Sequence, residues 1–133
     1  MNKNMLCQRA IDALKNSYSP YSNCKVGAAL LTESGKIYTG CNIENASFSP
    51  TICAERVAFS KAVSEGEHSF TAIAIAGEKS GVLTPFSPCG VCRQVMAEFC
   101  NADFKVLVVK TKDEFNEYTL SQLLPNSFNL KEI

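Results

Sequence analysis

The sequence of 133 residues predicts an α/β protein with a three-layer α-β-α fold, in which helices cover both faces of a mixed five-stranded sheet. Three observations predict it. Segments with helical periodicity alternate along the chain with short apolar or alternating segments typical of strands. The order of these segments is helix, strand, strand, helix, strand, helix, strand, with a further edge strand and a short helix, which implies a mixed sheet. The length fits a single domain spanning residues 1–133.

The first half of the chain predicts a helix, a hairpin and a second helix. Residues 3–16 form the first helix, whose apolar stripe consists of Leu6, Ala10, Ala13 and Leu14. Residues 25–32 and 37–41 are strands joined by a short polar turn, as in a β-hairpin. After Cys53, apolar residues recur at helical spacing until Glu65-Gly66, a combination that commonly ends a helix.

The second half predicts two buried strands that flank a third helix. Residues 70–76 form a strand, and a loop rich in Gly, Pro and Ser leads from it to a helix over residues 89–99. Residues 106–109 are apolar enough to form a strand buried on both faces. We expect residues 117–120 to add an edge strand and residues 121–124 to form a short helical turn.

The composition excludes several classes of protein. The 13 basic and 13 acidic residues give a formal net charge of zero, so the chain lacks the basic surface that nucleic-acid binding requires. No apolar run approaches the roughly 18 residues of a membrane span, and no signal peptide opens the chain. An odd number of cysteines, seven, argues against a disulfide framework. We therefore expect a cytoplasmic protein that acts on a small molecule and binds neither nucleic acid nor membrane.

Two short motifs carry the candidate chemistry. Cys53 and Glu55 form a Cys-x-Glu motif, and Cys89 and Cys92 follow Pro88 in a Pro-Cys-x-x-Cys motif. Three thiolates can hold one Zn²⁺ ion and leave its fourth position to water, as in catalytic zinc sites. A carboxyl group that is not a ligand can then move protons, and Glu55 lies close enough to one ligand for this role. The spacing therefore predicts a catalytic zinc site.

The predicted helices explain how these residues would meet. Both motifs lie where a helix begins, so free backbone N–H groups and the helix dipole favour the thiolate form. Cys89 and Cys92 are three residues apart and share one side of the first helical turn. Arg56 follows Glu55 and is placed to donate hydrogen bonds to ligand sulfurs, which would reduce their negative charge.

Each part of this pattern has a simpler interpretation. Cys53 alone would more often be a small buried apolar residue, and Glu55 alone a solvated helix residue. The pair Cys89 and Cys92 could form a redox dithiol, or half of a structural zinc site completed by Cys41 or Cys100. The combination of both motifs favours catalytic zinc over these alternatives.

The chain resembles the small, homotetrameric, zinc-dependent cytidine deaminases over nearly its whole length. The segments that carry the resemblance are Val26-Gly27-Ala28-Ala29-Leu30, Gly40-Cys41-Asn42-Ile43-Glu44-Asn45-Ala46, Cys53-Ala54-Glu55-Arg56 and Ser87-Pro88-Cys89-Gly90-Val91-Cys92-Arg93-Gln94. The resemblance implies hydrolysis of cytidine and 2′-deoxycytidine to their uridine counterparts and ammonia, a step of pyrimidine salvage. It implies one Zn²⁺ per subunit, held by Cys53, Cys89 and Cys92, with Glu55 as the proton shuttle.

The resemblance also implies a nucleoside-binding set. Asn42 and Glu44 match a pair that hydrogen-bonds the ribose hydroxyls. Ile43, which lies between them, and Ala54, which lies between Cys53 and Glu55, are expected to bind the substrate as well. Phe128 matches an aromatic residue that a neighbouring subunit contributes, so we expect a homotetramer with shared active sites. Residues two apart in a strand face the same side, which supports the pairing of Asn42 with Glu44. Alternatively, residues 42–45 form a polar turn whose side chains cap the backbone.

Two positions depart from the family pattern. Cys24 stands where related sequences usually carry Phe, and Phe48 stands where they often carry Tyr. A smaller wall and a lost hydroxyl would lower the affinity for cytidine, or admit a bulkier base, without changing the chemical step. A deaminase of another aminopyrimidine nucleoside, such as blasticidin S, therefore remains an alternative. A protein module that binds zinc without catalysing a reaction is the alternative from a different functional class.

Overall fold

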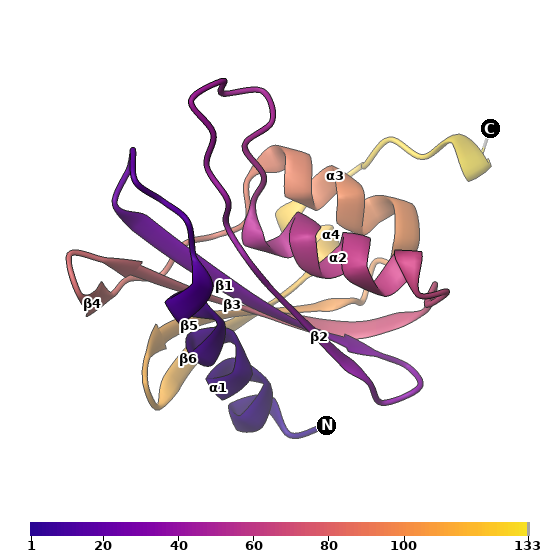
Figure 1. The fold of residues 1–133 in the computed structure, drawn as a ribbon. Helices are drawn as coiled ribbons and strands as arrows, with labels where there is room; N and C mark the ends of the chain where they lie inside the picture. The colour runs from indigo at the N-terminus through magenta and orange to yellow at the C-terminus, as the bar shows by residue number, and fades with distance from the viewer. Residues whose placement is uncertain (133) are drawn as a thin grey trace.

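The computed structural model describes the backbone of residues 1–132 and the side chains of residues 1–131. Its α-helices are α1 (Lys3–Ala13), α2 (Ala54–Ser64), α3 (Gly90–Phe99) and α4 (Leu120–Leu123), with 3-10 turns η1 (Leu14–Asn16) and η2 (Leu130–Glu132). Its strands are β1 (Cys24–Thr32), β2 (Ile37–Cys41), β3 (Phe70–Lys79), β4 (Val82–Leu83), β5 (Lys105–Thr111) and β6 (Glu114–Thr119). Figure 1 shows the helices packed against both sides of the sheet.

The sheet is mixed, as the sequence predicts. Its strand order is β2-β1-β3-β5-β6, and β4 pairs with the end of β3. All neighbouring strands are antiparallel except β3 and β5, which are parallel and are connected through α3. A parallel pair needs a crossover connection, so the position of α3 on one face follows from the direction of these two strands.

The three-layer arrangement is confirmed by the two cores, one on each face of the sheet. On one face α1 packs its buried residues Leu6 and Ala10 against alanines of β1 and β3. On the other face α2 and α3 cover a larger core that contains Ile73 and Ile75 of β3. The strand β3 thus presents isoleucines to one layer and small alanines to the other, so α1 can approach the sheet closely.

Two glycines allow helices to lie directly on the sheet. A Cβ atom at Gly40 of β2 would lie 2.7 Å from the backbone nitrogen of Ala58 and closer still to the carbonyl oxygen of Ala54, both in α2. A Cβ atom at Gly27 of β1 would meet the equivalent atoms of α1, Leu14 N at 3.0 Å and Ala10 O at a shorter distance. Gly40 therefore sets how closely the first turns of α2 approach the sheet.

Strand β4 was not expected, because the sequence between residues 77 and 88 predicts only a loop. Lys79 pairs with Val82 across the two residues Ser80 and Gly81, which both have positive φ, 52° and 79°. Two consecutive positive φ values are the mark of a type I′ hairpin turn, for which Ser-Gly is a suitable sequence. The hairpin signal was thus present in the sequence, although the strand that follows is only two residues long.

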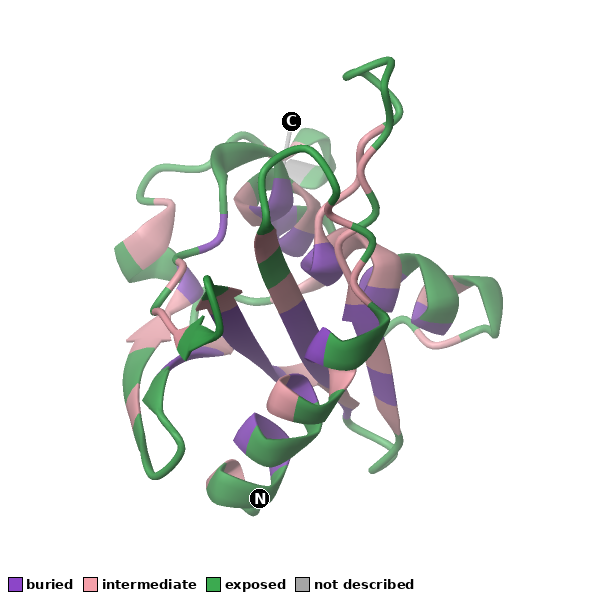
Figure 2. Ribbon diagram, turned by 60° about the vertical axis from the view of Figure 1, so that its left-hand side comes forward, coloured by how far each residue is buried: buried purple, intermediate pink, exposed green. Residues whose placement is uncertain are grey.

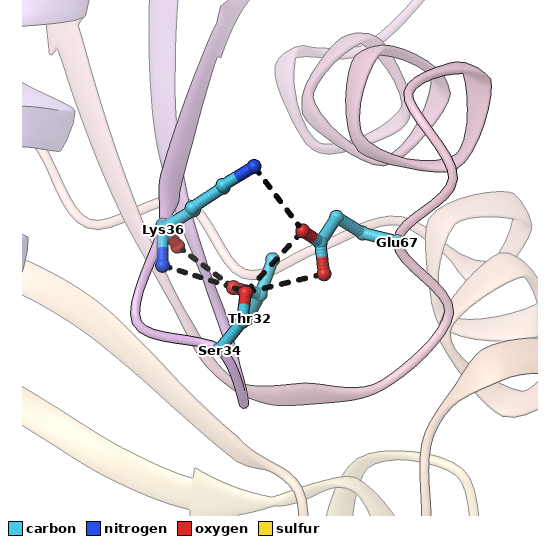
Figure 3. Close-up of polar contacts among 4 residues, drawn as sticks. All are labelled: Thr32, Ser34, Lys36 and Glu67. Atoms are coloured by element: carbon cyan, nitrogen blue, oxygen red, sulfur yellow. Dashed lines mark hydrogen bonds and ion pairs between the residues drawn. The ribbon is translucent and has the colours of Figure 1, made fainter.

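A polar cluster closes the turn between β1 and β2 (Figure 3). The hydroxyl of Thr32, which is 1% exposed, accepts a hydrogen bond from the backbone N–H of Lys36 and also bonds to the hydroxyl of Ser34. Ser34 donates to the carboxylate of Glu67, which forms an ion pair with the Lys36 side chain. This cluster ties the hairpin turn to the connection between α2 and β3.

The connection between β2 and α2 stands out from the body of the protein (Figure 1). Residues 45–50 are all exposed, and the loop rises from the ends of β2 and α2 (Figure 1). Figure 2 shows the contrast with the sheet, where buried residues dominate. Among residues 1–132, no helix is both long enough and apolar enough to cross a membrane.

Candidate metal centre

The three predicted ligands come together where two helices begin. Cys53 is the residue before α2, Cys89 is the residue before α3, and Cys92 lies in the first turn of α3. Neither Cys53 nor Cys89 uses its side chain to cap its helix, so both thiols remain available to a ligand. The positive ends of both helix dipoles point toward the three sulfurs, which favours their anionic form.

The distances between the sulfurs fit a tetrahedral metal site. The Sγ atom of Cys89 lies 3.8 Å from that of Cys53 and 3.7 Å from that of Cys92, and all three lie within 4.8 Å of one another. Zn–S bonds of about 2.3 Å arranged tetrahedrally place neighbouring sulfurs about 3.8 Å apart. The thiolate donors and their spacing therefore suit Zn²⁺, and with three protein ligands one position is left for another group.

The fourth ligand of a structural zinc site is missing from the part of the chain that the structure describes. The metal-suited group there consists of Cys53, Cys89 and Cys92 alone. Cys41 instead donates a hydrogen bond to the carbonyl of Asn16, and Cys100 lies beyond the far end of α3. The structure thus argues against the Cys₄ alternative that the sequence left open.

The sulfurs share hydrogen bonds with one another and with Arg56. Hydrogen bonds from Cys92 and then from the Arg56 guanidinium, opposed by burial, lower the pKa of the Cys53 thiol to about 5. The same Cys53–Cys92 hydrogen bond and burial raise the pKa of Cys92. Arg56 Nη2 lies 3.5 Å from Cys53 Sγ, and its Nε is buried without a hydrogen-bond partner among the described residues. Arg56 therefore lies beside the sulfur of Cys53, one of the three candidate metal ligands.

Glu55 is the most deeply buried charged residue of the site. It is 4% exposed and occupies the first turn of α2, two residues after Cys53. Burial is the main reason that the pKa of its carboxyl group is raised to about 7, and the charge of Cys53 adds to the effect. A buried carboxyl with a pKa close to neutral can both accept and release a proton, which is what a general acid–base requires.

Asn42 and Glu44 both contact the segment of residues 17–26, but through separate hydrogen bonds. Asn42 accepts from the backbone N–H of Val26 and from the Ser17 hydroxyl, and it donates to the carbonyl of Cys24. Glu44 accepts hydrogen bonds from the backbone N–H groups of residues 21 and 22 and from the Ser22 hydroxyl. These bonds, led by that of the Ser22 hydroxyl, lower the pKa of Glu44. The backbone-binding role that the sequence suggested for these residues is therefore present.

The other predicted substrate residues lie in different environments. Ile43 is 44% exposed, and its backbone bridges Tyr18 and Ile52. Ala54 is fully buried at the start of α2. Phe128 is 63% exposed, and its carbonyl oxygen accepts a hydrogen bond from Gln94 of α3.

A shallow cavity of about 360 Å³ lies beside Glu44. It is lined by Tyr21, Ser22, Glu44, Asn45, Phe48 and Thr51. Phe48, one of the two positions that depart from the family pattern, is 81% exposed there. Cys24, the other position, is half-buried at the start of β1.

Sequence reasoning missed three side chains that hold the predicted ones in place. Ser17 binds Asn42, Ser22 binds Glu44, and Arg93 binds the carbonyl of Pro88 directly before Cys89. Only Arg93 had a local signal, since it lies one helical turn after Cys89 on the same helix. The serines are more than twenty residues from their partners, so no local pattern could indicate them.

The fold and the site together define a class of protein, a three-layer α/β chain with a three-cysteine cluster suited to zinc and a buried glutamate next to it in sequence. Comparison with known proteins agrees. The family described as "Cytidine and deoxycytidylate deaminase zinc-binding region" matches residues 1–108. The cytidine deaminase of Sporosarcina psychrophila is 47% identical over all of this chain and 96% of its own length. That of Halalkalibacterium halodurans is 46% identical over all of this chain and 98% of its own length.

Solved structures give the same result. The crystal structure of cytidine deaminase from Burkholderia pseudomallei superposes with a TM-score of 0.87 at 41% identity, covering 96% of this chain and all of that one. The structure from Mycobacterium tuberculosis superposes with a TM-score of 0.82 at 35% identity, covering 98% of this chain and 99% of that one. The chain belongs to the cytidine and deoxycytidylate deaminase family.

Proposed function

We propose that this protein is a zinc-dependent cytidine deaminase of pyrimidine salvage, which hydrolyses cytidine and 2′-deoxycytidine to the corresponding uridine nucleoside and ammonia. One observation carries the proposal. Three cysteine sulfurs at tetrahedral spacing lie beside a buried glutamate, in a chain 47% identical from end to end to a cytidine deaminase. Cys53, Cys89 and Cys92 would hold one Zn²⁺ per subunit.

When bound, zinc would supply a Lewis acid that makes a water molecule nucleophilic near neutral pH. Glu55 would do the proton work. Its carboxylate would accept the proton that the attacking water loses and deliver it to ring N3. It would then take the second proton from the new hydroxyl group on C4 and pass it to the amino group, so that C4 becomes a carbonyl as ammonia leaves. Its burial keeps bulk water away from these transfers, and its place at the start of α2 holds it next to Cys53.

Arg56 would offset the surplus negative charge of three thiolates around one divalent ion. Its guanidinium donates to Cys53 and thereby withdraws charge from that sulfur. A less negative ligand set leaves more of the metal's positive charge to act on the water. Arg56 thus supports the reaction without touching the substrate.

Asn42 and Glu44 would recognise the sugar with the hydrogen-bonding capacity that the fold leaves free. Asn42 has both acceptor positions of its side-chain oxygen in use, so one N–H remains for a ligand. Glu44 accepts two hydrogen bonds at Oε1 and one at Oε2, so one acceptor position remains there. A hydroxyl group that accepts from the amide and donates to the carboxylate satisfies both. A free base lacks such a hydroxyl, so nucleosides should be preferred.

We also propose that the active form is a homotetramer in which Phe128 completes a neighbour's site. Phe128 is exposed, as are Phe48, Val91 and Leu130. Large apolar side chains exposed in this number favour burial against another chain. The cavity beside Glu44 is open in a single chain, so a neighbouring aromatic ring would help to enclose a nucleoside. A monomer by analytical ultracentrifugation with full activity would contradict this.

We further propose a cytoplasmic location. All seven cysteines are free thiols, three of them in the candidate zinc site, and free thiols persist in a reducing compartment. The balanced charge favours a free nucleoside over a polynucleotide as the substrate.

The decisive test is the loss of ultraviolet absorbance as purified, zinc-loaded protein converts cytidine to uridine. We expect turnover by the wild type, and loss of turnover by orders of magnitude in Glu55→Ala with zinc content unchanged. A non-catalytic zinc module would give no turnover in either protein. If the zinc-loaded wild type leaves cytidine intact, blasticidin S is the next compound to assay, because Cys24 and Phe48 would then have changed the substrate.

A further inference from the structure

Arg93 of α3 joins two segments that lie far apart in the sequence. Its Nε donates to the carbonyl oxygen of Pro88 at 2.7 Å, and its Nη1 donates to the carbonyl oxygen of Leu123 at 2.6 Å. Pro88 directly precedes the ligand Cys89, and Leu123 is the last residue of α4. Because the donor is charged and half-buried, both hydrogen bonds are stronger than a neutral pair would be.

The contact with Pro88 fixes the direction in which the Cys89 side chain points from the backbone. The carbonyl of Pro88 and the nitrogen of Cys89 belong to one planar peptide unit, so holding the oxygen holds the whole plane. Cys89 itself is exposed, and among the described residues its thiol hydrogen-bonds with the sulfurs of Cys53 and Cys92. Its position therefore depends on its backbone, and Arg93 is the side chain that anchors that backbone.

The contact with Leu123 ties the same guanidinium to the C-terminal segment. The last carbonyls of a helix have no partner within the helix, and a positive charge there also suits the helix dipole. Beyond α4 the chain is held to α3 again, because Gln94 donates to the carbonyl of Phe128 at 3.0 Å and Lys131 donates to that of Glu98 at 3.1 Å. Of these α3 contacts, only that of Arg93 also reaches the segment that carries Cys89.

We propose that Arg93 is a positioning residue for the zinc ligand Cys89 and that it couples zinc binding to the docking of residues 124–131. A metal that fixes Cys89 favours the arrangement in which the guanidinium bridges both carbonyls, which in turn holds the end of α4. The coupling is reciprocal, so a docked C-terminal segment raises the affinity for zinc. This inference rests on the proposed ligation of zinc by Cys89, and it does not depend on cytidine turnover.

The first test compares the zinc affinity of folded variants by competition with a chromophoric chelator. Arg93→Gln removes both hydrogen bonds and should weaken zinc binding by about 10- to 100-fold, the usual effect of losing a partner that orients a metal ligand. Arg93→Lys keeps the charge but cannot bridge both carbonyls, so its zinc affinity should also be lower than that of the wild type. Gln94→Ala is the matched control, because it breaks a contact with the C-terminal segment and leaves Pro88 untouched. Because both hydrogen bonds of Arg93 remain, its zinc affinity should fall much less than that of Arg93→Gln.

The second test is hydrogen exchange at the amide of Leu124 in the wild type, which donates to the carbonyl of Leu120 at 2.8 Å. Zinc should slow this exchange in the wild type and have no effect in Arg93→Gln. Equal exchange with and without zinc in the wild type would overturn the coupling, whether or not the variant folds. A folded Arg93→Gln with wild-type zinc affinity would overturn the positioning role. A wild type that binds no zinc would instead contradict the proposed function.

Discussion

Gly40→Ala should damage the active site by displacing the start of α2, although Gly40 itself touches no ligand. The new Cβ would lie 2.7 Å from Ala58 N and closer to Ala54 O, the two atoms joined by a helical hydrogen bond in the first turns of α2. Ordinary contact needs at least about 3.4 Å, so the helix must retreat by about 0.7 to 1 Å. Cys53 and Glu55 move with that turn.

Gly40→Ala should lower both the free energy of unfolding and the catalytic rate. Overpacking typically costs about 1–3 kcal/mol of the free energy of unfolding. A displacement near 1 Å of a catalytic group can lower the rate by about 100-fold. We therefore expect kcat for cytidine to fall by about 10- to 100-fold in zinc-saturated Gly40→Ala, with urea unfolding shifted to lower concentration.

Gly27→Ala is the matched control, because its Cβ would meet the equivalent backbone atoms of α1 on the opposite face of the sheet. It should lose a similar amount of stability and keep kcat near the wild-type value under conditions where circular dichroism shows it folded. If Gly40→Ala keeps kcat within about twofold of the wild type, or if Gly27→Ala loses as much as Gly40→Ala, the reasoning from helix displacement to rate is wrong.

Four further results are expected. Glu55→Gln should keep its zinc by metal analysis and lose cytidine turnover by about 100-fold or more, and substantial residual activity would exclude it as the proton carrier. Cys24→Phe and Phe48→Tyr should lower KM for cytidine and leave kcat unchanged; an unchanged KM in both would remove these positions from the affinity argument. Thr32→Val should cost about 1 kcal/mol in urea unfolding, because the backbone N–H of Lys36 loses its acceptor and the buried hydroxyl of Thr32 is removed, without altering zinc affinity. Burial raises the pKa of Cys7 from 9.0 to about 11, so the unfolded chain loses this proton first and stability falls as the pH rises from 9 toward 11. The loss at pH 10 is about 1 kcal/mol, and Cys7→Ala should show a correspondingly smaller drop in unfolding free energy between pH 8 and pH 10.

The fold was largely predictable because its elements carry local signals. The helix before β1 and the helices that follow Cys53 and Cys89 begin and end within a few residues of the predicted limits. The first helix differs in its last turn, where residues 14–16 tighten into the 3-10 turn η1. The edge strand β6 begins at Glu114, three residues earlier than expected, because a tight turn after Thr111 brings it back along β5. Such boundaries depend on strand pairing, which a single segment does not reveal.

The candidate site was also predictable only in part from the sequence. The residue types and spacing of Cys53, Cys89 and Cys92 predict a zinc site, because coordination chemistry restricts which side chains can serve. The distances between their sulfurs depend on α2 and α3 starting side by side. The contacts of Ser17, Ser22 and Arg93 join residues 22 to 30 positions apart or a side chain to a distant carbonyl, so they follow only from the folded chain.

The sequence by itself determined the helices, the strands, the donor set for zinc and the family to which the chain belongs, since these depend on residue type and on short spacings. The tertiary structure decided how closely α2 lies on β2, how deeply Glu55 is buried, and which groups Asn42 and Glu44 bind. These quantities depend on packing between segments that are distant in the chain. Burial and hydrogen-bond geometry are properties of that packing, and no local pattern of residues encodes them.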